Sequence, residues 1–387
     1  MKNHNWIVLL VLAIAIMTMG ACRKQPAPSQ QNANSNATPT AQDVPASGAA
    51  TSGEKFYFRG TIASLKIEVT LLRDGERVTG SYFYPKVGKN IELRGTIDKN
   101  GSLDLRESDE SGKETGVFKG KWGRASAEPD LGMADITGKW SRPDGSKETS
   151  FQLKQAPIEF TAAVRVVPKL IKEANKQSHY TIDVEYPQID GDARFDKFNK
   201  EARAMITKEV AAFKASETAT AADSTSDTLP EAPDSSMDCG YEIRIATDDL
   251  ISVEFSESTY SRGAAHPNSY TSVLNYDVKN GKKLSLGDLF NAKSTYLKTI
   301  ADYCVKDLKA QSKKDKDLML DDAQIQSGAG PRADNYKAWT ITKKGLWITF
   351  DPYQVGPYAA GAKTVLVPYS ALKDLIKSDG PIGSFAK

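Results

Sequence analysis

Residues 55–155 alternate hydrophobic and polar positions with a period of two. The stretch 66–71 reads KIEVTL and the stretch 91–97 reads IELRGTI. Such alternation predicts half-buried strands with one face in water. Tight-turn dipeptides separate the runs, namely Asp74-Gly75, Asn100-Gly101, Ser111-Gly112 and Asp144-Gly145. We therefore predict an all-β domain of about eight strands, an antiparallel meander that is curled or closed as a small barrel.

A glycine two residues before a large apolar side chain recurs through this region. The instances are Gly80-Ser81-Tyr82, Gly95-Thr96-Ile97, Gly116-Val117-Phe118, Gly120-Lys121-Trp122 and Gly138-Lys139-Trp140. Glycine inside a strand often marks a bend or a close approach of two backbones. Trp122 and Trp140 would either line a ligand-binding mouth or fill a small core, and we interpret them as core residues.

Residues 157–378 mix helical and strand periods. Apolar residues recur at three- and four-residue steps over 195–213 and 294–311, which predicts two longer helices. Asp192 is the expected N-cap of the first. The strands and a last short helix are expected at 160–167, 179–186, 241–246, 250–260, 270–278, 339–342, 346–351, 364–367 and 369–377. These elements predict an α+β domain with a mainly antiparallel sheet.

The segment 217–238 interrupts this pattern. It is rich in Thr, Ala, Ser and Asp and carries six acidic residues with no Lys or Arg. We predict a solvated loop here.

The N-terminus has the features of an export signal. Lys2 precedes a mostly apolar run of 14 residues, Trp6–Met19, which is too short to span a hydrocarbon core of about 30 Å comfortably. Small residues and Cys22 follow, so residues 1–21 are predicted to be a signal peptide. Met19-Gly20-Ala21-Cys22 resembles a bacterial lipobox, which implies cleavage before Cys22 and lipidation there. An ordinary signal peptide with a chance cysteine is the alternative.

The expected location is the cell envelope, with the lipid on Cys22 as the membrane anchor. Arg23 stands where an Asp often retains lipoproteins in the inner membrane, which favours the outer membrane if the cell has one. Residues 22–54 are rich in Pro, Ala, Ser, Asn, Thr and Gln, and Arg23–Gly53 contains no aromatic residue, Leu, Ile or Met. Such a segment cannot bury enough apolar surface to offset its ordering entropy, so we predict a disordered tether.

The composition excludes several classes of function. With 51 Lys+Arg against 49 Asp+Glu among 387 residues, the chain has no strongly basic character, and no nucleic-acid partner is expected. Three His and three Cys leave little for a metal centre, because a catalytic zinc site takes about three protein ligands. No Gly-x-Ser-x-Gly nucleophile motif occurs in the sequence. We therefore assign no catalytic residue, metal or cofactor.

Carboxylates are the remaining candidates for acid–base chemistry. Glu254, Glu257 and Asp277 lie near His266 in sequence. Their spacing cannot select a catalytic pair, and we interpret them as strand residues on a face in water.

Two thiols remain once Cys22 carries lipid. Cys239 and Cys304 would then stand in an oxidising compartment, where disulfides persist. We predict a disulfide between them, closing a loop of about 65 residues and adding roughly 4 kcal/mol of stability. The alternative is two reduced thiols, with Cys304 packed in the core on its helix.

A series of motifs in residues 157–378 resembles a known family. The motifs are Tyr260–Asn268 (YSRGAAHPN), Leu274–Asp277, Asn280–Lys282, Leu284–Phe290, Gly345–Phe350 and Tyr353–Gly361 (YQVGPYAAG). In this order they are similar to the extracytoplasmic domain shared by the anti-sigma factor RsiV and the peptidoglycan deacetylase PdaC. The resemblance implies the fold, a compartment outside the cytoplasm and a binding role. In the anti-sigma relative the domain binds lysozyme, and in the deacetylase it accompanies a separate catalytic domain.

Two loops within these motifs carry the candidate ligand-binding residues His266, Asn268, Tyr353 and Tyr358. His266 precedes a proline, which favours an extended backbone. Its alternative role is structural, through a hydrogen bond to a neighbouring backbone group, and the tyrosines could instead pack under the sheet. Because rigid loops on a sheet scaffold often carry binding residues, we predict that the two loops lie close together as one recognition surface.

The function expected from these features is non-catalytic binding at the cell envelope. The partner would be a lysozyme-like protein or a cell-wall glycan. A cell-wall hydrolase that uses carboxylates, or a purely structural lipoprotein, are the alternatives.

Overall fold

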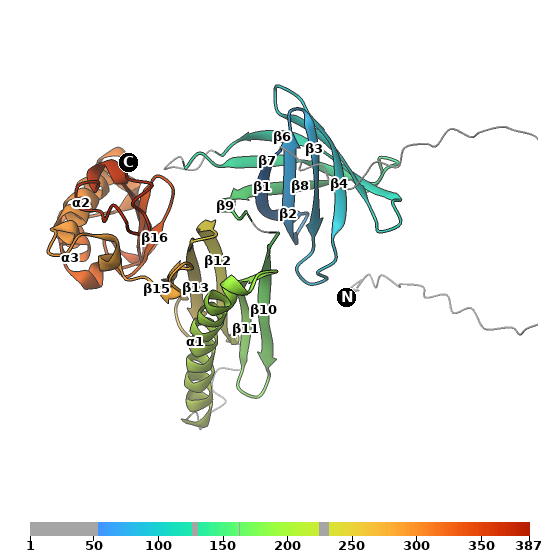
Figure 1. Cartoon of the computed structure of the whole chain (residues 1–387). Helices are drawn as coiled ribbons and strands as arrows, with labels where there is room; N and C mark the ends of the chain where they lie inside the picture. The colour runs from blue at the N-terminus through green and yellow to red at the C-terminus, as the bar shows by residue number, and fades with distance from the viewer. Residues whose placement is uncertain (1–52, 126–130, 162, 224–231) are drawn as a thin grey trace, which may run out of the picture. The chain divides into compact units, whose positions relative to one another are not determined.

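The computed structural model describes residues 53–125, 131–161, 163–223 and 232–387 (Figure 1). The predicted signal peptide, Cys22 and the tether up to residue 52 lie outside the described residues. Within the described part of the chain, no helix is both long and apolar enough to cross a membrane.

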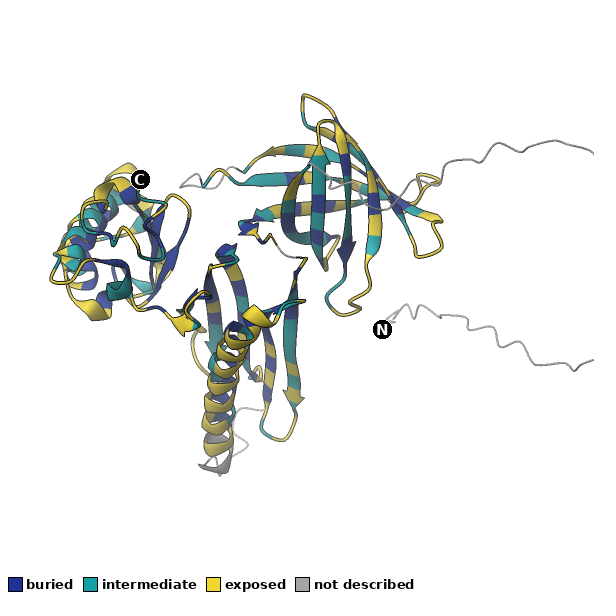
Figure 2. Cartoon of the chain, in the orientation of Figure 1, coloured by how far each residue is buried: buried dark blue, intermediate teal, exposed yellow. Residues whose placement is uncertain are grey.

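The first folded region is a closed antiparallel barrel, as the alternating pattern predicted (Figure 1). Each strand pairs with the next, and β1 pairs with β8 to close the ring. Buried and exposed residues alternate along the strands (Figure 2). The strands are β1 (Glu54–Ile62), β2 (Leu65–Asp74), β3 (Arg77–Phe83), β4 (Ile91–Ile97), β5 (Ser102–Ser108), β6 (Glu114–Arg124), β7 (Ala134–Ser141) and β8 (Thr149–Ala156).

The repeated glycines are explained by close approach of neighbouring strands. A Cβ on Gly95 would lie 1.9 Å from the carbonyl oxygen of Asp104, and a Cβ on Gly80 would lie 2.0 Å from that of Thr70. Only glycine permits such contacts, so these positions are where the barrel curves.

The two barrel tryptophans pack against the barrel core, in agreement with our interpretation. The Trp122 ring lies edge-on to Phe56 and Phe58, at centroid distances of 4.9 and 5.2 Å. Nε1 of Trp140 donates a hydrogen bond to the buried carboxylate of Glu107 at 3.0 Å.

The second region is built on a mixed sheet in the order β10-β11-β12-β13-β14-β15, with the short β9 beside β12. Most pairs are antiparallel, but β11 and β12 run parallel, and the short β9 also runs parallel to β12. A parallel pair needs a crossover connection, and α1 (Asp196–Asp223) provides it. The strands are β9 (Ile158–Glu159), β10 (Arg165–Asn175), β11 (Tyr180–Asp190), β12 (Ser235–Thr247), β13 (Leu250–Tyr260), β14 (Asn268–Asp277) and β15 (Lys282–Lys283).

Two expectations around α1 need correction. Asp192 caps a short 3₁₀ turn, Ala193–Phe195, that precedes the helix. The segment 217–238 is not one loop: the helix continues to Asp223 and β12 already begins at Ser235. The helical conformation is open to the alanines, the threonines and Glu217 of this segment. Glu217 is buried rather than solvated. The absence of positive charge therefore did not signal a loop.

The C-terminal region adds a second, three-stranded sheet and the remaining helices. The expected last helix over 369–377 is only a 3₁₀ turn at Tyr369–Ala371, because Ile376 forms a β-bridge with Phe290 instead. The short helix α3 was not predicted. The elements are β16 (Trp339–Ile341), β17 (Gly345–Phe350), β18 (Lys363–Pro368), α2 (Tyr296–Lys314) and α3 (Asp322–Ala329).

The predicted disulfide is wrong, because both cysteines are free thiols. Cys239 packs in the core between α1 and the mixed sheet, whereas Cys304 packs in the separate core of the C-terminal region. Burial raises the pKa of the Cys239 thiol to about 12, so it stays protonated and unreactive.

Candidate functional site

The two predicted recognition loops contact each other. His266 lies between β13 and β14, and Tyr358 lies between β17 and β18. The hydroxyl of Tyr358 donates a hydrogen bond to the carbonyl oxygen of Pro267 at 2.6 Å. The rings of His266 and Tyr358 stack with centroids 4.0 Å apart and an interplanar angle of 22°. This confirms the predicted proximity of the loops.

Tyr353 extends this cluster of rings. Its centroid lies 5.5 Å from that of Tyr358, and the residue is 57% exposed. Its backbone has a φ of 71°, a left-handed conformation that costs a non-glycine residue about 1–3 kcal/mol. We call His266, Tyr353 and Tyr358 the aromatic platform.

Contacts with α3 and with Asn335 in the turn that follows it hold the strained loop in place. Nε2 of Gln324 donates to the carbonyl oxygens of Tyr353 and Gly356, each at 3.0 Å. Nε2 of Gln354 donates to the carbonyl oxygens of Gly328 and Asn335, at 3.0 and 2.9 Å. These four bonds make the tyrosine loop a defined surface rather than a freely moving one, and the core-packing alternative does not apply to the exposed Tyr353.

Asn268, the remaining predicted residue, directly follows Pro267 of the histidine loop. Asn268 is exposed at the first position of β14. Nδ1 of His266 donates to the carbonyl oxygen of Pro267 at 2.9 Å, so this residue also has the structural role that we considered. Sequence reasoning missed Tyr270, which is 47% exposed on β14 and whose hydroxyl lies 2.9 Å from Oγ1 of Thr259.

The three carboxylates near His266 in sequence are buried, which corrects our interpretation of them as residues facing water. Glu254 accepts hydrogen bonds from Arg244 at 2.7 Å and from Thr349 at 3.0 Å. Asp277 accepts two from Asn280. Glu257 accepts one from Ser272, and burial raises its pKa.

Alternation alone misplaced these carboxylates because both faces of the sheet are covered. Val253 and Phe255 on β13 pack in the core with α1. On the other face, the Ser252 hydroxyl accepts a hydrogen bond from the backbone N–H of Ile341 on β16. A strand residue that points away from α1 is therefore still inside the protein.

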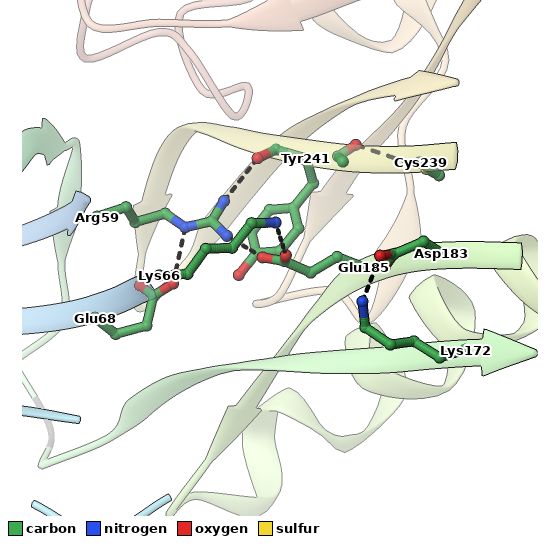
Figure 3. A network of polar contacts seen from close by, with 9 residues as sticks. Arg59, Lys66, Glu68, Lys172, Asp183, Glu185, Cys239 and Tyr241 are labelled. Carbon is green, nitrogen blue, oxygen red and sulfur yellow. Dashed lines mark hydrogen bonds and ion pairs between the residues drawn. The ribbon is translucent and has the colours of Figure 1, made fainter. Parts of the chain in front are cut away.

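A second polar constellation joins the barrel to the mixed sheet (Figure 3). Nε of Arg59 on β1 donates a hydrogen bond to Oε1 of Glu68 on β2 at 2.9 Å. A terminal nitrogen of the same guanidinium donates to the carbonyl oxygen of Tyr241 on β12 at 2.7 Å. Arg59 also pairs with Glu185 on β11, and Lys66 bonds to the other oxygen of Glu185 at 2.5 Å. The guanidinium lies over the Tyr241 ring, 3.9 Å from its centroid. We call these five residues the interdomain network.

Burial dominates the electrostatics of this network. Glu185 is 3% exposed and forms ion pairs with two cations, Arg59 and Lys66. Burial raises the pKa of Glu68 to about 7, although Arg59 acts to lower it. The alternating pattern predicted that Lys66 and Glu68 lie on the strand face exposed to water. No local signal marks a network whose members Arg59 and Glu185 stand 126 positions apart.

Among the described residues, no group of three or more His, Cys, Asp or Glu side chains is placed to hold a metal ion. The aromatic platform and the interdomain network are thus the two constellations that remain as candidates.

Comparison with known families identifies the region that holds the platform. A family model described as deacetylase PdaC matches residues 173–269, and a model described as a protein of unknown function, DUF3298, matches residues 287–370. The chain therefore contains a PdaC/DUF3298-like domain, as the motifs predicted. His266 lies in the first match, and Tyr353 and Tyr358 lie in the second, so the platform is made by both.

Individual relatives are distant. The chain is 28% identical over 141 residues to the peptidoglycan-N-acetylmuramic acid deacetylase PdaC of Bacillus subtilis (strain 168), a match that covers 36% of this chain and 29% of that protein. Crystal structures of DUF3298 family members from Bacteroides fragilis and Pseudomonas aeruginosa are similar with TM-scores of 0.45 and 0.40, at 19% and 17% identity. They cover 59% and 55% of this chain, and 98% and 94% of their own.

Proposed function

We propose that this chain, through its PdaC/DUF3298-like domain, binds the glycan of peptidoglycan at the cell envelope without cleaving it. The observation that carries the proposal is the aromatic platform, in which stacked rings from two loops leave Tyr353 exposed. Aromatic faces pack well against the C–H faces of sugar rings, and rigid loops keep the ordering cost of binding low. The distant relationship to a peptidoglycan deacetylase supports a ligand of this class.

A sugar fits the platform better than a protein partner does. A stable protein interface buries about 800 Å² on each side, which takes roughly 20–30 residues. The platform comprises three rings, which suits one or two sugar residues. A lysozyme-like protein therefore ranks second as ligand.

Replacing Tyr353 with Ala is expected to weaken binding to purified peptidoglycan sacculi at least about thirtyfold, since an aromatic hot spot contributes about 2 kcal/mol or more. The melting temperature should hardly change, because the Tyr353 side chain is exposed and because tyrosine and alanine pay a similar cost for the left-handed backbone at this position. Tyr358→Ala should weaken binding similarly, and Tyr353→Phe should retain most of it. The measurement is co-sedimentation of the full chain with sacculi over a range of concentrations.

Leu65→Ala is the matched control, because it removes a 58% exposed apolar side chain from the barrel. It should leave binding unchanged. Full binding by both Tyr→Ala variants would refute the platform as the glycan site. Capture of lysozyme but not of sacculi would favour the protein ligand instead.

We further propose that the protein is anchored outside the cytoplasm by lipid on Cys22, following the lipobox-like sequence Met19–Cys22. Cys22→Ser should move the protein from the membrane fraction to the soluble fraction, or should leave the unprocessed precursor. Fractionation and the mass of the N-terminal peptide measure both outcomes. Normal processing with full membrane retention of Cys22→Ser would contradict lipidation.

A further inference from the structure

A cavity of about 560 Å³ lies beside the interdomain network. Its walls come from the barrel strands β1, β2, β7 and β8, from β12, and from the turn between β16 and β17. Cavities of about 300–1,000 Å³ at the junction of domains are common sites for small molecules. None of the aromatic-platform residues lines it, so it is a separate site from the proposed glycan surface.

Much of the lining is apolar. Hydrophobic side chains come from both sides of the junction: Ile67, Leu131, Met133, Ala156, Pro157 and Ile243. Such a lining favours a ligand with an apolar body, because the ligand then removes apolar surface from water. The network forms a polar part of the wall, where Arg59 and Glu68 are already bonded to each other.

The charged residues of the lining are mainly cationic. Six cations face three carboxylates, the cations being Arg59, Lys66, Lys154, Arg244, Lys343 and Lys344. Lys66 is paired with Glu185 and Lys343 with Glu159. Lys154 on β8 forms no ion pair with any carboxylate among the described residues, although Asp135 is its register partner on β7. The Lys154 ammonium group therefore lies in the lining without a carboxylate partner among the described residues.

From this lining we propose that the cavity binds a small amphipathic carboxylate, with its apolar body against Ile67, Met133 and Ile243 and its carboxylate on Lys154. Lys154 is exposed, so a neutral apolar molecule would gain nothing from its charge, and a cation would be repelled by the surrounding Lys and Arg side chains. A sugar would leave the apolar lining poorly matched.

The test is isothermal titration calorimetry of the full chain with octanoate, and with octanol and octylamine as chain-length-matched probes. Octanoate should bind, octanol at least about tenfold more weakly, and octylamine not measurably. Lys154→Met keeps the alkyl stem of the side chain and removes its charge, and we expect it to weaken octanoate binding about tenfold or more. Lys154→Glu should abolish binding.

Lys139→Met on β7 is the matched control, because Lys139 is a barrel lysine outside the cavity lining. Its affinity for octanoate should equal that of the unmodified chain. The proposal is overturned if octanoate does not bind, if octylamine binds as well as octanoate, or if Lys154→Met and Lys154→Glu bind it as tightly as Lys139→Met does. Tyr353→Ala should leave octanoate binding unchanged, which separates this site from the glycan proposal.

Discussion

Arg59→Met is expected to lower the free energy of unfolding by about 3–5 kcal/mol, because it leaves the buried Glu185 without the less exposed of its two cationic partners. Only Lys66, whose side chain is 67% exposed, would remain to compensate that carboxylate. Methionine fills much of the volume of the arginine stem, so the loss reports charge and hydrogen bonds more than packing. Urea unfolding of the full chain measures it.

The cost of Arg59→Met should be larger at pH 8 than at pH 5. In the intact protein Arg59 lowers the pKa of Glu68, which burial nevertheless raises to about 7. Without Arg59 the pKa of Glu68 in the folded state rises further above its value in the unfolded state. Between these two pKa values the folded state binds more protons than the unfolded state. Stability then falls as the pH rises through that range. At pH 5 a protonated Glu68 adds no unpaired charge.

Two further variants keep this prediction testable. Arg106→Met on β5 removes a half-exposed arginine that pairs with Asp104 and Glu114, and surface pairs of this kind contribute little to stability. At pH 5 the double variant Arg59→Met/Glu185→Gln should recover much of the loss, since residue 185 is then neutral and Glu68 is protonated. If Arg59→Met costs no more than Arg106→Met, the network does not stabilise the junction.

Local patterns were enough to predict the barrel. Alternation and turn dipeptides are properties of neighbouring residues, and each strand pairs with the next. The same reasoning failed where the pairing was not local. The parallel pairing of β11 with β12 depends on α1, whose last turns have no apolar periodicity to reveal them.

The candidate sites also differ in whether local sequence motifs revealed them. The platform residues were found because His266 and Tyr358 lie in motifs rich in Gly, Pro and Tyr, although 91 positions separate Tyr358 from Pro267. The interdomain network and the cavity were not found, because their residues carry no shared motif. The cysteines show the opposite error: two thiols in one compartment do not pair when each belongs to a different core.

The platform also depends on a glycine in α3. Gly328 in α3 packs so closely on the tyrosine loop that a Cβ there would lie 1.8 Å from the carbonyl oxygen of Gln354. A glycine in a helix normally costs about 1 kcal/mol relative to alanine. Gly328→Ala should instead destabilise the protein by about 1–3 kcal/mol, because the loop must move away from the helix.

The same substitution should weaken binding to sacculi. Moving Gln354 breaks its bond to the carbonyl oxygen of Gly328 and displaces the neighbouring Tyr353, whose carbonyl is held by Gln324. Ser327→Ala is the matched control, since this exposed neighbour in α3 should change stability by no more than about 0.5 kcal/mol and leave binding intact. Urea unfolding and co-sedimentation measure the two effects. If Gly328→Ala stabilises the protein as an ordinary helix substitution would, or binds sacculi normally, then α3 does not position the platform.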